Sequence, residues 1–181
     1  MRNQRPTIVY FSIPYFSIVV LTVISLLSSC ASSTGNEQPE ANFGFTLEYG
    51  SCSIDKLDTF KGEFIQGRVV EPDLTIPMEL SINQMRRIYE GMAEIDLVSY
   101  PDAFKVPEPL FGEVVRISSP FYYALFLENG HTKISIRWLD DLVKPTTPKA
   151  DRLRGWFDGI IKMIREHPAY QQLPKVNFGC I

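Results

Sequence analysis

The sequence has little histidine or cysteine, and it lacks the motifs that mark most enzymes. Its 181 residues include three cysteines and two histidines, His131 and His167. Two histidines exclude a histidine-rich zinc site, and no G-x-S-x-G segment supplies an activated nucleophile. The glycines form no phosphate-binding pattern, and no D-x-[DN]-x-[DN]-G calcium loop is present. We therefore expect no catalytic residue, no metal site and no cofactor, with both histidines at the surface.

Charge is also missing from one long stretch near the start of the chain. Residues 8–27 carry no charged side chain, and Arg2 and Arg5 precede them. A basic start, an apolar middle and a junction of small residues are typical of an export signal. The apolar run ends in the letters LSSC, at residues 27–30.

This LSSC segment resembles the lipobox of bacterial lipoproteins at all four positions. The resemblance implies cleavage between Ser29 and Cys30, a signal peptide over residues 1–29 and a diacylglyceryl group on the Cys30 thiol. Each buried CH₂ contributes about 0.8 kcal/mol, so two or three acyl chains hold a protein firmly at a bilayer. The alternatives are an uncleaved membrane helix and a secreted soluble protein. The lipoprotein interpretation predicts the extracytoplasmic face of the cell membrane, or the outer membrane in a host that has one.

The mature chain has no excess of basic residues. Removing residues 1–29 takes away two arginines and no acid, which changes the formal net charge from −3 to −5. No basic stripe indicates nucleic acid, and the acidic balance argues against electrostatic docking on anionic lipid. Attachment to the membrane is therefore expected through Cys30. Residues 30–41 are small and polar and are predicted to be a flexible tether.

Lipidation of Cys30 leaves Cys52 and Cys180 as an even pair. In an oxidising compartment such a pair indicates a disulfide. The bond would tie the C-terminal tail to the region after the first strand. The other interpretation is two separate thiols.

Residues 42–181 are predicted to form one α+β domain, with an antiparallel sheet of about six strands and two packed helices. Alternating apolar residues indicate the strands. Pro77 favours an edge position for the strand that contains it. The expected extended segments are 42–50, 58–70, 74–80 and 113–118, together with the two strands of a hairpin around residues 129–130.

Two segments have helix signals. Ser81 and Gln84 form a capping box, and Thr147 precedes Pro148 at the first turn of the second helix. We expect Gly155, together with Gly159, to allow close helix packing. The first apolar stripe is Ile82, Met85, Tyr89, Met92 and Ile95, and the second is Leu153, Trp156, Phe157, Ile160, Ile161 and Ile164.

Asn129-Gly130 predicts a hairpin with a type I′ turn, because that turn needs positive φ at both central residues. In the resulting register Tyr122 opposes Arg137 and Phe126 opposes Lys133, on the face away from the core. Such aromatic–cation pairs indicate either a solvated or helix-covered face, or an exposed binding surface. The proline-containing segment 102–113 is a second candidate, because structureless loops of that length are often functional.

Carboxylates are the remaining chemical groups to consider. One interpretation is that they are solvated loop acids. The other is that two of them converge in a cleft, as a carboxylate-dependent envelope hydrolase would require. The candidate acids are Asp55, Asp58, Glu63, Glu71, Asp73, Asp140 and Asp141.

The domain also resembles small uncharacterised bacterial envelope lipoproteins. The resemblance lies in Gly50-Ser51-Cys52, in RIYEGMAEID at residues 87–96, in the hairpin and in YQQLP at residues 170–174. It brings no catalytic residue with it. The anchor and the missing catalytic motifs together predict a non-enzymatic module that binds an envelope protein or peptide. A further hypothesis is a purely structural or stress-induced lipoprotein.

Overall fold

The computed structural model describes residues 42–108, 110–144 and 146–175. The predicted signal peptide, the lipidation site Cys30 and the tether lie outside these residues, as does Cys180. Their assignments stay predictions. Among the described residues, no helix combines the length and apolarity needed to cross a membrane.

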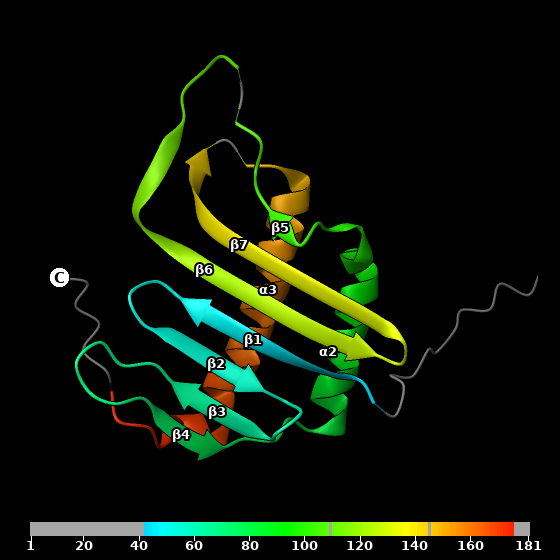
Figure 1. The fold of residues 1–181 in the computed structure, drawn as a ribbon, viewed down its shortest axis with the longest axis vertical. Coiled ribbons are helices and arrows are strands. Elements are labelled where there is room, and N and C mark those ends of the chain that lie inside the picture. Colours follow the sequence, from blue (N-terminus) through cyan, green and yellow to red (C-terminus); the bar gives the residue numbers. More distant parts are fainter. Residues whose placement is uncertain (1–41, 109, 145, 176–181) are drawn as a thin grey trace, which may run out of the picture. The chain divides into compact units, whose positions relative to one another are not determined.

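The domain is an α+β fold built on one seven-stranded sheet (Figure 1). The strand order is β4-β3-β2-β1-β6-β7-β5, and every neighbouring pair is antiparallel except β5 and β7. The fold class is therefore confirmed, with seven strands rather than about six. The strands are β1 (Gly44–Gly50), β2 (Ile54–Asp58), β3 (Glu63–Gln66), β4 (Leu74–Pro77), β5 (Ala103–Phe104), β6 (Val115–Asn129) and β7 (Thr132–Lys144).

The number of strands differs from the predicted number because several strands are short. The segment predicted as extended over 58–70 holds the end of β2, a turn and β3, while β2 itself begins earlier. Within 102–113, two residues form β5 and pair in parallel with β7. The segment 113–118 is the start of β6, which is one long strand with register irregularities near Arg116. Pro77 ends β4 at the edge of the sheet, as predicted.

Both main helices begin at the predicted caps. The Ser81 hydroxyl accepts from the Gln84 amide N–H at 3.3 Å, and the Gln84 side chain accepts from the Ser81 N–H at 2.8 Å. Thr147 accepts from the Ala150 N–H at 3.1 Å. The helical elements are α2 (Ile82–Glu94), η1 (Leu97–Ser99), α3 (Pro148–Glu166) and α4 (Pro168–Gln171).

The core lies between one face of the sheet and the helices α2 and α3, which Figure 1 shows behind the strands. Tyr123 of β6 stacks on Phe157 of α3, with ring centroids 4.6 Å apart. Full burial of a side chain such as Leu47 or Phe64 contributes about 1.5–3 kcal/mol. The opposite face of the sheet carries no helix in Figure 1.

The predicted apolar stripe is correct for α3 and only partly correct for α2. All six predicted residues of α3 are buried. In α2, however, Ile82 is 79% exposed, and Ile88 is buried instead. Ile82 is the first residue of the helix, where the chain enters from solvent, so helical spacing alone placed it wrongly on the core side.

The prediction that Gly155 and Gly159 permit close packing is wrong. A Cβ at either position would meet nothing within 4 Å. The close approach occurs at Gly91 of α2, where a Cβ would lie 2.8 Å from Cδ1 of Trp156. The indole N–H of Trp156 donates to the Ile88 carbonyl at 3.2 Å.

The hairpin register also differs from the prediction. Asn129 pairs with Thr132, so the two loop residues are Gly130 and His131. Only Gly130 of these has positive φ (59°), as in a type II′ turn rather than type I′. The Asn42 side chain accepts from the Gly130 N–H at 3.1 Å, which adds a tertiary contact that the turn sequence could not reveal.

The observed register of the hairpin differs from the predicted one by two residues. Each side chain therefore stays on its predicted face of the sheet, but the predicted cross-strand pairs are wrong. Tyr122 opposes Leu139 and Phe126 opposes Ser135. The predicted core residues Tyr123, Leu125, Leu127, Ile134 and Ile136 are all buried.

Candidate functional site

A groove of about 520 Å³ lies beside the free edge of β7. All six consecutive residues from Arg137 to Leu142 line it. Successive residues of a strand point to opposite faces, so a cavity that touches all six runs along the strand edge. β5 covers this edge only at Arg137 and Trp138, and the segment 103–108 forms the other wall.

The groove contains half of the predicted binding face. Tyr122 and Arg137 line it, together with residues 103–106 and 108 of the segment 102–113 that was the second candidate. Phe126 and Lys133 lie nearer the hairpin turn. Phe126 packs near Phe60, with ring centroids 6.3 Å apart, and Lys133 pairs with Glu128 at 2.6 Å. The structure therefore separates the four predicted residues into two pairs.

Arg116 organises the exposed side of the groove. Its guanidinium donates to Glu108 on one side and to Asp141 on the other. Hydrogen bonding to Glu108 and the charges of both acids raise the pKa of Arg116 above its ordinary value. These contacts join the wall, β6 and β7. Sequence patterns did not indicate Arg116, because its partners are distant in the chain.

Two other cations of the groove have no such partners. Neither Lys105 nor Arg137 forms an ion pair with any residue that the structure describes, and both are exposed. Since Glu108 and Asp141 bind Arg116 and Asp140 binds Arg154, Lys105 and Arg137 remain available to pair with the carboxylates of a partner. Lys105 was not singled out by sequence, although the segment that carries it was.

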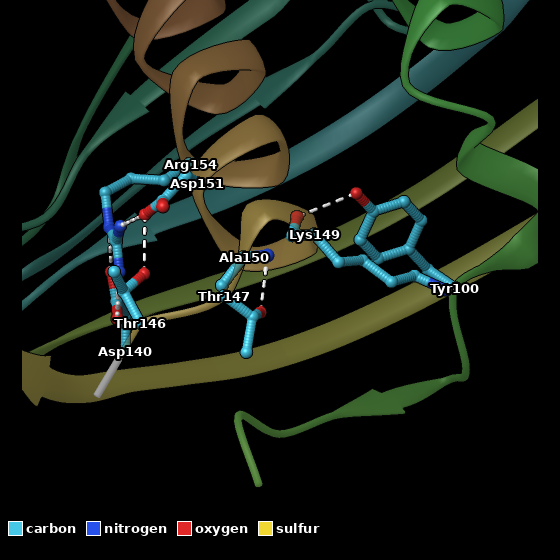
Figure 2. A network of polar contacts seen from close by, with 8 residues as sticks. All are labelled: Tyr100, Asp140, Thr146, Thr147, Lys149, Ala150, Asp151 and Arg154. Atoms are coloured by element: carbon cyan, nitrogen blue, oxygen red, sulfur yellow. Dashed lines mark hydrogen bonds and ion pairs between the residues drawn. The ribbon is translucent and has the colours of Figure 1, made fainter. Parts of the chain in front are cut away.

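The base of the groove is held by a second ion pair, shown in Figure 2. Asp140 is 7% exposed and accepts two hydrogen bonds from Arg154 of α3, at 2.6 and 2.9 Å. The same guanidinium donates to Asp151 at 2.8 Å, and Thr146 donates to Asp151 at 2.5 Å. The hydrogen bonds to Asp140 raise the pKa of Arg154. This fork fixes β7 on the first turns of α3.

The start of α3 has further ties to the segment before β5. Tyr100 donates its hydroxyl to the Lys149 carbonyl at 2.8 Å (Figure 2). The Lys149 ammonium lies 4.4 Å from the centre of the Tyr100 ring and donates to the Ser99 carbonyl at 2.7 Å. The wall of the groove thus begins at an anchored point.

The wall ends in an exposed apolar tip. Leu110 and Phe111 are 93% and 92% exposed. Figure 1 shows the connection between β5 and β6 extending past the ends of the neighbouring strands. Large apolar side chains exposed together are unusual on a monomer and are typical of contact with a partner.

The predicted acids do not meet as a free pair in this groove. Asp58 accepts from the Phe60 and Lys61 backbone N–H groups. The other early acids act locally: Glu63 pairs with Lys61, Glu71 pairs with Arg68, and Asp73 accepts from the Arg68 N–H. Asp55 is buried elsewhere, beside Gly67.

The two histidines and the described cysteine lie outside the groove. His131 is in the exposed hairpin turn, and His167 lies between α3 and α4, where its Nδ1 accepts from the Ala169 N–H at 3.2 Å. Cys52 is disulfide-bonded. Since Cys180 is outside the described residues, the pairing of Cys52 with Cys180 stays a prediction. No cluster of three or more metal-binding side chains occurs in the described part of the chain.

No protein-family model matches this chain, and no curated protein matches it.

Proposed function

We propose that this protein is a lipid-anchored bacterial envelope module that binds an extended, acidic segment of another envelope protein or peptide. The anchor is the acylated Cys30 of the LSSC segment, and the binding site is the groove beside β7. The observation that carries the binding proposal is the free edge of β7, bordered by two cations that form no ion pair within the part of the chain that the structure describes.

The edge supports recognition of an extended chain. A strand edge offers backbone N–H and C=O groups to an incoming strand, and neighbouring pockets select its side chains. β7 continues from Leu139 to Lys144 with no β5 residue paired to it. The groove of about 520 Å³ beside this stretch has room for the side chains of a short segment.

The charges support an acidic partner. Lys105 and Arg137 stand at the groove without carboxylate partners among the described residues. Arg137 can bind a carboxylate through two parallel hydrogen bonds. Tyr122 adds an aromatic surface beside it, and Leu110-Phe111 adds apolar contact at the end of the wall.

The ion pairs favour binding over the carboxylate hydrolase. A hydrolase of that kind needs one carboxylate to donate a proton and another to accept one. The acids of the groove are Glu108, Asp140 and Asp141, and each is bound to an arginine.

The groove is tested by site-specific photocrosslinking in cells. A photoreactive side chain at Leu139 should capture a partner, whereas one at Ser135, on the same face near the hairpin turn, should not. Arg137→Glu should reduce capture at Leu139 by about tenfold, because reversal of a charge at an acidic partner costs roughly 1.4 kcal/mol or more.

The matched control is Lys133→Glu, which reverses a charge on the same strand and face but outside the groove. It should leave capture at Leu139 unchanged. Equal capture at Ser135 and Leu139, or undiminished capture in Arg137→Glu, contradicts the assignment of the groove.

A further inference from the structure

A second cavity, of about 310 Å³, lies where β1 and β2 meet the end of α3. It shares no lining residue with the groove beside β7. Its lining includes Tyr49, Asp55, Phe121, Arg165 and Tyr170. The set contains one acid, one base and three aromatic rings.

Tyr49 has an unsatisfied hydroxyl inside this region. The residue is 2% exposed, and its hydroxyl has no hydrogen-bond partner among the described residues. The charged and polar groups that act on this phenol are Asp55, Tyr170 and Arg165, all of which line the cavity. The hydroxyl is therefore buried close to the charged groups of the cavity, and such a buried group is costly unless something bonds to it.

Asp55 supplies a buried negative charge. The residue is 8% exposed, and its Oδ1 accepts from the Gly67 N–H at 3.0 Å. No described residue donates to its other oxygen. Burial raises the pKa of this carboxyl to about 6, so it is mainly ionised at neutral pH. Arg165 acts on this carboxyl only from beyond ion-pair distance, so an ammonium group in the cavity would provide a direct counter-charge.

Arg165 supplies the opposite charge from the last turn of α3. It is exposed and forms no ion pair within the described residues, so its guanidinium does not directly contact Asp55. Phe121 and Tyr170 add aromatic surface, and aromatic faces attract ammonium groups. Tyr170 is held by an edge contact with Phe64, with centroids 5.5 Å apart.

We propose that this cavity binds a small zwitterion, such as a free α-amino acid, with its ammonium group on Asp55 and its carboxylate on Arg165. The Tyr49 hydroxyl bonds to the bound molecule. The pairing of charges follows from two oppositely charged side chains that line one cavity and form no ion pair with each other. A site of this size is at the lower end of small-molecule cavities and suits a single small ligand.

The test is thermal unfolding of the full chain, purified in detergent, with each of the twenty L-amino acids added singly. At least one should raise Tm in proportion to the logarithm of its concentration. For the amino acid with the largest effect, the decarboxylated amine and the deaminated acid should each bind at least about tenfold more weakly, since each lacks one charged contact.

Three variants assign the contacts. Asp55→Asn and Arg165→Gln should each lower affinity about tenfold or more. Tyr49→Phe should lower affinity about fivefold to tenfold, but raise Tm of the ligand-free protein, because it removes an unsatisfied buried hydroxyl. Arg165 is exposed, so its variant should fold normally. Lys162→Gln, on the same helix outside the cavity, is the control and should bind normally.

The absence of a Tm shift with every amino acid would overturn the proposal. So would equal binding of the amine analogue, which would make the cavity a site for simple cations. Undiminished affinity in Asp55→Asn or Arg165→Gln would overturn it as well.

Discussion

At the scale of single residues, the buried aspartates Asp140 and Asp55 differ in the hydrogen-bond donors that their carboxylates meet. Asp140 meets the guanidinium fork of Arg154. Among the described residues, only the Gly67 N–H donates to Asp55, and burial raises the pKa of this carboxyl to about 6. A buried charge without a full partner is destabilising unless a ligand compensates for it. Asp140 therefore serves the fold, and Asp55 is the better candidate for binding.

The raised pKa of Asp55 predicts a dependence of stability on pH. The carboxyl binds a proton more tightly in the folded chain than in the unfolded chain, so the free energy of unfolding should fall as pH rises from about 4 to about 6. The shift corresponds to at most about 3 kcal/mol. Asp55→Asn keeps an acceptor for the Gly67 N–H and carries no charge. Urea unfolding should find this variant more stable than the parent by about 1–3 kcal/mol at pH 7, and similar to it near pH 4.

Glu90→Gln, at an exposed position of α2, controls for the loss of one negative charge. It should keep the pH dependence of the parent. A variant at Asp55 that follows the same pH curve as the parent would show that this carboxyl is not the group responsible.

At the scale of elements, the contact between α2 and α3 depends on one glycine. Gly91 leaves room for the indole of Trp156, whose N–H reaches the Ile88 carbonyl of α2 at 3.2 Å. Gly155 lies on α3 in open space. Glycine lowers helix stability by about 1 kcal/mol relative to alanine, so the two positions should respond oppositely to the same substitution.

Gly91→Ala should destabilise the protein by about 1–3 kcal/mol, because the new methyl group would overlap the indole ring. Gly155→Ala should stabilise it by up to about 1 kcal/mol. Denaturant unfolding of both variants gives the comparison. Destabilisation of equal size at both positions would contradict the packing described for this pair of helices.

At the scale of the whole molecule, one sheet provides two separate candidate sites. The helices cover one face, which builds the core, while the free edge of β7 borders the groove. The second cavity lies at the ends of β1 and β2 beside α3. The tether predicted over residues 30–41 would let the domain reach a partner while its N-terminus stays in the bilayer.

The anchor gives a prediction for the full chain. Cys30→Ala removes the only thiol in the LSSC segment, so the protein should lose incorporation of radiolabelled palmitate and accumulate as an unprocessed precursor. Gel electrophoresis with fluorography measures both effects. Cys52→Ala, which removes a disulfide-bonded cysteine outside the LSSC segment, is the control and should leave labelling intact. Normal labelling in Cys30→Ala would falsify the lipoprotein assignment.

Local signals allowed much of the secondary structure to be predicted. The caps at Ser81 and Thr147 lie where the sequence placed them, because capping joins residues only three positions apart. Alternation identified the core side of the hairpin, and Pro77 was placed correctly at the edge of the sheet. The short strands β2 and β5 were missed or merged, since a few residues give too little periodicity to identify.

For the candidate site, the sequence indicated Tyr122, Arg137 and the segment 102–113, but not that they border one groove. It also grouped Phe126 and Lys133 with them, because all four residues lie on one face of the hairpin, whereas the groove covers only the part of that face farther from the turn. The turn at Gly130-His131 changed each cross-strand pair.

The sequence by itself determined the fold class, the helix starts and the faces of the main strands, because these depend on neighbours within one turn of a helix or one strand period. It is also the source of the lipobox prediction, which needs no fold. Only the tertiary structure decided the hairpin register, the two carboxylates bound by Arg116, the fork between Asp140 and Arg154, and the meeting of Asp55 with Arg165 at one cavity. The physical reason is that ion pairs and cavities join residues far apart in the chain, and no local pattern specifies which distant segments the collapse of the core will bring together.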